Sequence, residues 1–281
     1  MTEQFAETRR RIENVHQLEA VVSAMRAIAA SRAQQARGLL PGLHAYTSVI
    51  AHAIGQALAL LPEGHDPAGN QAHRGATILF CAEEGFAGAF SDRVLDVVAT
   101  DATMRDLFLV GTRGVMLAGE RRIPLAWHTA MVPQAGLIPG LAGRIADALY
   151  DWLSDSVGPR VDVIVPTWSA AGGVTVERRS LLPFDFRHFS MPAPGQQPPL
   201  ITLPPQVLLA RLAEEYVFAE LCEEALTAFA AENEARVAAM LAAKTNLEHM
   251  RSGLEALERQ IRQEEITAEV VALASGAGLR R

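Results

Sequence analysis

Apolar residues recur at helical spacing along the N-terminal segment of the chain. Three or four residues separate each from the next, which places these side chains on one face of an α-helix. The stripe consists of Ile12, Val15, Leu18, Val22, Met25 and Ile28. Because proline lacks an amide hydrogen, we expect Pro41 and the adjacent Gly42 to kink or break the helix. A loop then begins near residue 61 and runs to about residue 75, so the pattern predicts an N-terminal helical domain over residues 1–62.

The middle of the chain alternates short apolar runs with amphipathic stretches. Strand-like runs cover residues 76–84, 106–111, 125–132, 161–170 and 174–183. Helix-like stretches cover residues 85–99 and 138–155. Such alternation favours an α/β fold with a mainly parallel sheet. We therefore expect a Rossmann-like α/β domain over residues 75–190.

A proline-rich connection over residues 190–205 leads into a second long helical segment. Its apolar positions step by four and three residues in turn, the spacing of a coiled-coil seam. They are Ala243, Leu247, Met250, Leu254, Leu257 and Ile261. A helix of about 70 residues would be roughly 105 Å long. The segment predicts a C-terminal helical domain over residues 205–281.

The last residues of this segment remain apolar, with Ile266, Val270, Val271 and Leu273 close to the chain end. Chain termini usually fray and are polar, so an apolar helix end requires a partner. Two terminal helices that each carry an apolar stripe would pair antiparallel. The predicted fold is therefore α/β, with long N- and C-terminal helices that form an antiparallel coiled coil.

Composition excludes several classes of function. The net charge of −7 argues against nucleic-acid binding, which favours a basic surface. Cys81 and Cys222 form no CxxC pair, so we expect neither a disulfide framework nor a zinc site, and a reducing compartment. The N-terminus lacks the apolar stretch of a signal peptide. The apolar run over residues 48–61 is shorter than the ~20 residues that span a bilayer, so direct membrane insertion is not expected.

The sequence offers little catalytic chemistry. Glu83 and Glu84 follow a predicted strand, but no nucleophile or metal-ligand spacing accompanies them, so we expect surface carboxylates rather than an acid/base pair. The histidines form no HExxH or HxH motif. Residues 84–88, EGFAG, match neither GxGxxG nor a Walker loop, so we expect no phosphate cradle, cofactor or metal.

The N-terminal segment resembles the signature of the F-type ATP synthase gamma subunit family. In that family Ile and Val three residues apart precede an Ala-Met-basic-x-Val/Ile-Ala-Ala-Ser-basic run. Residues 9–36 match without a gap at Ile12, Val15, Ala24, Met25, Arg26, Ile28, Ala29, Ala30, Ser31 and Arg32.

The C-terminal segment resembles the same family. Its motif is Ile-Thr-x-Glu-x-x-acidic-x-x-x-Gly-Ala, preceded by Arg-Gln. The matching residues are Arg262, Gln263, Ile266, Thr267, Glu269, Gly276 and Ala277, and Ala272 stands where an acidic residue is usual. Residues 232–246 also resemble the family's Glu-x-x-Ala-Arg-x-x-x-Met run, with Arg236 in the arginine position.

The middle of the chain resembles the family more loosely. Residues 83–93 resemble its Asp-Arg-Gly-Leu-Cys-Gly-Gly-Leu-Asn stretch, with Glu84 in place of the arginine. Residues 110–114, VGTRG, resemble its Gly-x-Lys-Gly. The chain departs from the commonest gamma sequences over residues 16–23, at Glu83 and Glu84, and at Ala272. These departures look like those of the alternate F-type enzymes called N-ATPases, which are thought to move sodium ions.

The resemblance implies a non-catalytic rotor shaft that couples ion flow, of protons or sodium ions, to ATP synthesis or hydrolysis on β subunits. It also implies three α and three β subunits around one copy of this chain, an epsilon subunit, and a ring of c subunits against the α/β domain. The location implied is peripheral, on the cytoplasmic face of the cell (inner) membrane. The coupling ion, the number of c subunits and the net direction of the reaction are not readable from this sequence.

The family's rotor–stator contacts carry over to particular residues. Arg236, Arg262, Gln263 and Thr267 match positions that contact the β subunits in the family. Met25 and Glu269 match the neighbouring coupling region, and Arg26 replaces the usual lysine, which keeps the charge but changes the donor geometry.

Two alternative functions, an enzyme and a passive scaffold, stay open. An α/β enzyme that dimerises through its terminal helices would carry a polar pocket at the carboxyl ends of its strands. A passive coiled-coil scaffold would tolerate changes at Arg262, Gln263 and Thr267. Apart from the resemblance, the apolar chain end could also form the core of a two-helix hairpin, a reading that the resemblance makes the weaker one.

Overall fold

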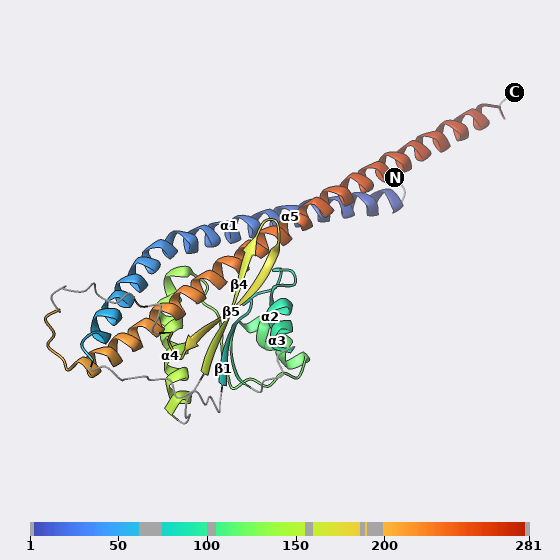
Figure 1. Ribbon diagram of the computed structural model, residues 1–281. Helices are drawn as coiled ribbons and strands as arrows, with labels where there is room; N and C mark the ends of the chain where they lie inside the picture. The colour runs from blue at the N-terminus through green and yellow to red at the C-terminus, as the bar shows by residue number, and fades with distance from the viewer. Residues whose placement is uncertain are drawn as a thin grey trace. The chain divides into compact units, whose positions relative to one another are not determined.

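Along the chain, one long helix precedes an α/β sheet and another follows it in the computed structural model, which describes residues 3–61, 75–99, 105–154, 160–185, 189 and 199–278 (Figure 1). The first is α1, Glu3–Leu58, and the other is α5, Pro205–Gly278. The predicted fold class is therefore confirmed.

The chain divides into two compact units, and each long helix contributes to both. Met1–Ala29 and Val237–Arg281 form one, here called the helical unit, and Ala30–Arg236 forms the other, here called the α/β unit. The domain bounds drawn from sequence follow whole helices instead, and they stay a prediction.

The sheet of the α/β unit is mainly parallel, as predicted. Its strands are β1 Gly75–Phe80, β2 Asp106–Val110, β3 Trp127–Thr129, β4 Arg160–Ser169 and β5 Gly173–Leu182. Their order is β3-β2-β1-β4-β5, and only the hairpin partner β5 runs antiparallel. The carboxyl ends of β1, β2 and β3 thus meet at one edge.

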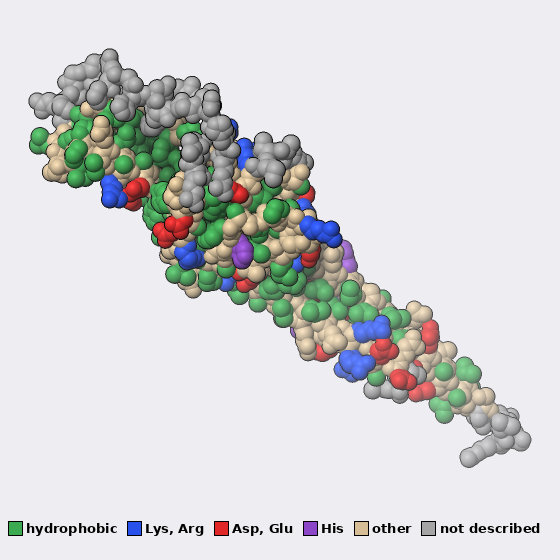
Figure 2. Space-filling view, turned by 90° about the horizontal axis from the view of Figure 1, so that it is seen from below, with side chains coloured by type: hydrophobic (Ala, Val, Ile, Leu, Met, Phe, Trp, Pro, Cys, Tyr) green, Lys and Arg blue, Asp and Glu red, His purple; other side chains and the backbone are tan. Residues whose placement is uncertain are grey.

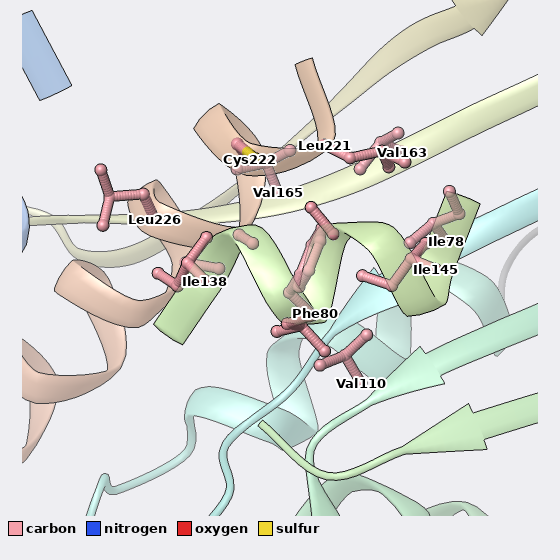
Figure 3. Packing of buried hydrophobic residues seen from close by; sticks show 14 of the residues in the cluster. Ile78, Phe80, Val110, Ile138, Ile145, Val163, Val165, Leu221, Cys222 and Leu226 are labelled. Carbon is pink, nitrogen blue, oxygen red and sulfur yellow. The ribbon is translucent and has the colours of Figure 1, made fainter. Parts of the chain in front are cut away.

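Alternate residues of β1 face two different apolar layers. Ile78 and Phe80 pack with α4, Ile138–Ser154, and with buried residues of α5 such as Leu221 (Figure 3). Leu79 and Cys81 face the opposite side, where α2, Phe90–Ala99, and α3, Thr112–Glu120, cover the sheet. Because side chains alternate across a strand, β1 is buried on both faces.

Three local expectations need correction. The sequence pattern did not predict α3, a short helix with two internal glycines, and placed the start of α2 at residue 85 instead of Phe90. A break at Pro41 is also wrong, because α1 continues through it. The burial of Ala36 and Ile50 on either side shows that packing within the α/β unit holds α1 there.

In the helical unit, the two long helices pair through a seam that differs from the predicted stripes. Leu18 and Ile28 of α1 lie on its exposed side, as do Met250 and Leu257 of α5. The residues that turn inward and are buried are Phe5, Val15, Ala29, Met240 and Ile261. Only part of each predicted stripe therefore faces the partner helix, and further apolar side chains remain on the surface.

In the described part of the chain, every helix falls short of the length and apolar character needed to cross a membrane.

Candidate functional site

The end of α5 carries most of the residues that the family motif predicts as contacts. Arg262, Gln263, Thr267 and Glu269 are all exposed. The Thr267 hydroxyl donates a hydrogen bond of 2.8 Å to the Gln263 carbonyl, one turn earlier. Arg262, the Gln263 side chain and Glu269 point to solvent and are available to a partner.

Large apolar side chains share this exposed segment. The exposed fractions are 53% for Ile266, 58% for Val270, 60% for Val271 and 76% for Leu273. Scattered apolar residues are ordinary on protein surfaces, but a run of them on one helix end marks an interaction site. The two-helix hairpin core considered from sequence is therefore wrong for these four residues, because no described residue covers them.

Met25 and Arg26 lie on the other helix of the helical unit and are half-buried. Neighbouring Val21 and Ile28 are 55% exposed each, so α1 also presents apolar side chains outward. Met25 and Arg26 are thus partly engaged with the helix pair and partly accessible.

Arg236 differs from the other predicted contacts, because it is buried inside the α/β unit. It is 5% exposed, and its guanidinium donates to the Glu232 carboxylate at 2.5 Å and to the Asn233 side-chain oxygen at 3.1 Å. Its Nε donates to the Gly85 carbonyl at 3.3 Å. Arg236 therefore ties α5 to the loop that follows β1.

Glu232 is the centre of this network. It accepts a hydrogen bond of 3.2 Å from the backbone of Glu83 as well as the bond from Arg236. Burial raises the pKa of Glu232, and Arg236 acts in the opposite direction. The sequence contains the signal, since Glu and Arg four residues apart face each other on a helix, but it does not show that the pair is buried.

Glu83 closes the carboxyl edge of the sheet. Its carboxylate accepts hydrogen bonds from the backbone amide of Thr112 at 2.9 Å, the Thr112 hydroxyl at 2.7 Å and the amide of Met131 at 2.8 Å. Thr112 begins α3, so the carboxylate occupies the position at a helix N-terminus that favours anions. Glu84 is exposed as predicted, but Glu83 is half-buried and structural rather than a surface carboxylate.

The hollows near this edge are small. One of about 190 Å³ lies against Arg32, Glu84, Pro133 and the Glu232–Arg236 pair, and one of about 300 Å³ lies against the loop at Gly85–Gly88 and Arg113. The residues that the structure describes contain no group of three His, Cys, Asp or Glu side chains suited to a metal. Basic and acidic side chains are interspersed on the face that Figure 2 shows.

Sequence reasoning missed several ion pairs that join distant segments, among them two that involve α5. Glu19 of α1 binds Arg251 of α5 at 2.7 Å within the helical unit. In the α/β unit, Arg179 of β5 binds the buried Glu224 of α5 at 3.0 Å. Both join residues far apart in the chain, so no local pattern could reveal them.

Comparison with known proteins identifies the family. A sequence model described as ATP synthase matches residues 4–278. The ATP synthase gamma chain of Frankia casuarinae is 28% identical over 297 residues, with 99% of this chain and 98% of that protein covered. The gamma chain of Kineococcus radiotolerans is also 28% identical, over 298 residues, with 99% and 97% covered.

Solved structures share the fold. A chain in the Euglena gracilis mitochondrial ATP synthase, solved with OSCP, F1 and c-ring, has a TM-score of 0.69 and 12% identity, and the match covers 99% of this chain and 96% of that one. A chain in the rotor of the same enzyme has a TM-score of 0.62 and 12% identity, with 94% and 99% covered. The chain belongs to the ATP synthase gamma chain family.

Proposed function

We propose that this chain is the central shaft of an F-type ATP synthase. It is a non-catalytic subunit that couples ion movement through the membrane part of the enzyme to ATP synthesis or hydrolysis on the β subunits. The observation that carries the proposal is the end of α5, where four large apolar side chains from Ile266 to Leu273 are exposed. A ring of surrounding subunits would cover such an end.

The proposed partners follow from this role. Three α and three β subunits surround one copy of the chain, and the α/β unit holds an epsilon subunit and rests on the ring of c subunits. The enzyme then lies on the cytoplasmic face of the cell membrane, with this chain as a peripheral component. Coupling is conformational, because a shaft that contacts each β subunit differently biases their equilibria.

The proposed contacts divide into two kinds. Arg262, Gln263, Thr267 and Glu269 would make specific, breakable polar contacts from the exposed end of α5. Met25 and Arg26 would contribute from α1.

Arg236 is assigned to the same group by the family motif. A direct contact would require its guanidinium to leave Glu232. In the structure as described, Arg236 would influence a partner only through the loop at Gly85 that it holds.

The departures from the commonest gamma sequences, such as Glu84 and Ala272, support assignment to the sodium-moving N-ATPase group. In that role this chain would not itself bind the transported ion. Sodium dependence of ATP hydrolysis by the assembled enzyme would test the assignment.

The enzyme alternative has less support. Its substrate pocket should lie at the carboxyl edge of the sheet. There the carboxylate of Glu83 already binds the amides of Thr112 and Met131.

Native mass spectrometry after co-expression with the α and β subunits of the same organism tests the proposal. We expect a complex with three α, three β and one copy of this chain. A stable homodimer that does not bind α and β would contradict the shaft and favour the enzyme or scaffold.

A double substitution tests the proposed contacts. Gln263→Leu with Thr267→Val should lower ion-coupled turnover of the assembled enzyme, because both polar groups leave the exposed surface. The matched control is Gln260→Leu with Thr245→Val, in which Thr245 likewise bonds to the carbonyl four residues earlier. Equal turnover in both double variants would count against these contacts and favour a passive scaffold.

A further inference from the structure

The helical unit contains an ion pair between its two helices at a position where an apolar contact is usual. Glu19 on α1 binds Arg251 on α5 at 2.7 Å, and the Glu19 side chain is only 13% exposed. Arg251 also approaches Glu255 at 3.5 Å. Neighbouring inward positions on α1 are apolar, such as Val15 and Val22, so this pair interrupts an apolar seam.

The energetics of the pair argue against a mainly stabilising role. The Oε1 atom of Glu19 is buried and has no hydrogen-bond partner among the residues that the structure describes. A buried carboxylate that is only partly satisfied costs free energy, and ion pairs of this kind are often replaced by apolar residues without loss of stability. The pair therefore requires another explanation.

The apolar seam alone does not define how the helices align along their axes. The observed alignment brings Val15 near the level of Leu254 and Val22 near the level of Leu247. A slide by one heptad would bring Val15 level with Ile261 and Val22 level with Leu254. Because an apolar residue again faces an apolar residue, the heptad repeat permits both registers.

The charged positions distinguish these registers. In the slid register, Glu19 would lie level with Glu258, and Arg251 level with Arg26. Arg26 and Glu258 are half-buried, so both juxtapositions would place like charges within the seam. A slide in the other direction would bring Glu19 level with Lys244 but leave Arg251 level with Ile12, without a carboxylate on α1. Only the observed register gives both Glu19 and Arg251 a partner of opposite charge on the facing helix.

We propose that Glu19 and Arg251 act as a positioning pair that holds α1 and α5 of the helical unit in one axial register. A polar residue in a seam can specify register at the expense of stability. The relevance of the register to torque rests on the proposed function, since a shaft whose helices slide would dissipate rotation. The register itself does not depend on that function.

The test is a distance measurement between spin labels on the full-length chain. Asn14→Cys and Ala242→Cys place the labels on exposed positions of the two helices, about 21 Å apart along the axis. Cys81 and Cys222 are buried, and the chain without added cysteines shows whether they take up label. A one-heptad slide toward Glu258 would lengthen the separation along the axis by about 10 Å.

The decisive variant exchanges the charges, Glu19→Arg with Arg251→Glu. The pair survives in the observed register. In the slid register, the introduced arginine now lies level with Glu258 and the introduced glutamate lies level with Arg26, and both juxtapositions are attractive. We expect one distance peak in the wild-type chain and a second, longer peak in the exchanged chain. The matched control, Glu13→Arg with Arg259→Glu, exchanges exposed charges and should keep the single peak.

A second variant removes both charges, Glu19→Leu with Arg251→Leu. We expect it to unfold at the same temperature as the wild-type chain or higher, and to show more than one distance. A single wild-type distance peak in the exchanged chain would overturn the proposal. If the exchanged chain does not fold, the same distance is measured in the Leu variant, where a single wild-type peak would likewise overturn the proposal. Neither outcome bears on whether the chain binds α and β subunits, which native mass spectrometry tests separately.

Discussion

At the scale of single residues, Arg236 has a measurable internal role. The change Arg236→Met would leave the buried Glu232 carboxylate without its positive partner. We expect the free energy of unfolding of the isolated chain to fall by about 3–5 kcal/mol. Urea denaturation followed by circular dichroism measures this difference.

The control for this prediction is Arg259→Met, on an exposed position of the same helix. It should change the free energy of unfolding by no more than about 0.5 kcal/mol. An equally small effect for Arg236→Met would mean that the buried network contributes little, and would favour an outward role for Arg236.

Gly111 is a second residue with an internal structural role, because its backbone conformation and its close neighbours require glycine at this position. Its φ of 113° lies in a region that L side chains rarely adopt, and a Cβ there would lie 2.4 Å from the Cys81 carbonyl oxygen. We expect Gly111→Ala to lower the free energy of unfolding by more than about 2 kcal/mol. In Gly119→Ala, which meets no atom within 4 Å, we expect a gain of about 0.4–1 kcal/mol, measured in the same way.

The residue types at the candidate sites were readable from the sequence, but their environments were only partly so. Exposure of Arg262, Gln263 and Thr267 follows from a polar helix face and agrees with the structure. The inward position of Arg236 depends on the loop at Gly85, which lies 151 residues away in the chain. The role of Glu83 depends on the ends of two further segments, so no local pattern predicts it.

At the scale of elements, the helix pair shows why a sequence stripe can be misassigned. The exposed Leu18 and Ile28 belong to a second apolar stripe beside the buried one that contains Val15 and Ala29. Helical periodicity alone does not say which stripe faces the partner helix. The stripe that the partner helix buries is known only from the structure, and the other stripe remains exposed on the surface.

The contact between α5 and β5 predicts a dependence of stability on pH. Burial raises the pKa of Glu224 to about 7, although Arg179 lowers it. Between about pH 4.5 and 7 the folded chain therefore binds more protons at this site than the unfolded chain. The free energy of unfolding should fall by about 3 kcal/mol as the pH rises through that window.

Urea denaturation across the pH range measures the slope of the free energy of unfolding against pH. The change Glu224→Gln should make this slope less steep. Some slope should remain, because burial also raises the pKa of the adjacent Glu220. The control Glu264→Gln, at an exposed position of the same helix, should retain the full slope. A Glu224→Gln chain with an unchanged slope would contradict the assignment.

At the scale of the whole molecule, the order of the hydrophobic patterns along the chain was enough to predict the architecture. Long stretches of helical period at both ends and alternating short runs between them correspond to α1, α5 and the sheet. The strand order β3-β2-β1-β4-β5 was not readable, because crossovers between parallel strands leave no periodic signal. The helix α3 was missed for a related reason: its nine residues are too short for a period to appear.

The exposed end of α5 gives the last prediction, which separates stability from assembly. Removal of residues 266–281 takes away side chains that are exposed as far as Ser275. Because these described side chains bury little surface, the free energy of unfolding of the isolated chain should change by no more than about 0.5 kcal/mol.

The assembled enzyme should respond differently, if α and β subunits surround this end. Burial of an apolar side chain on binding contributes about 1.5–3 kcal/mol when it is complete. Loss of Ile266, Val270, Val271 and Leu273 should therefore lower the collision energy at which the complex with α and β releases this chain in native mass spectrometry. A truncated chain that unfolds at lower urea would show that the end packs on the chain itself. A truncated complex as resistant as the full-length one would show that the surrounding subunits do not hold this end.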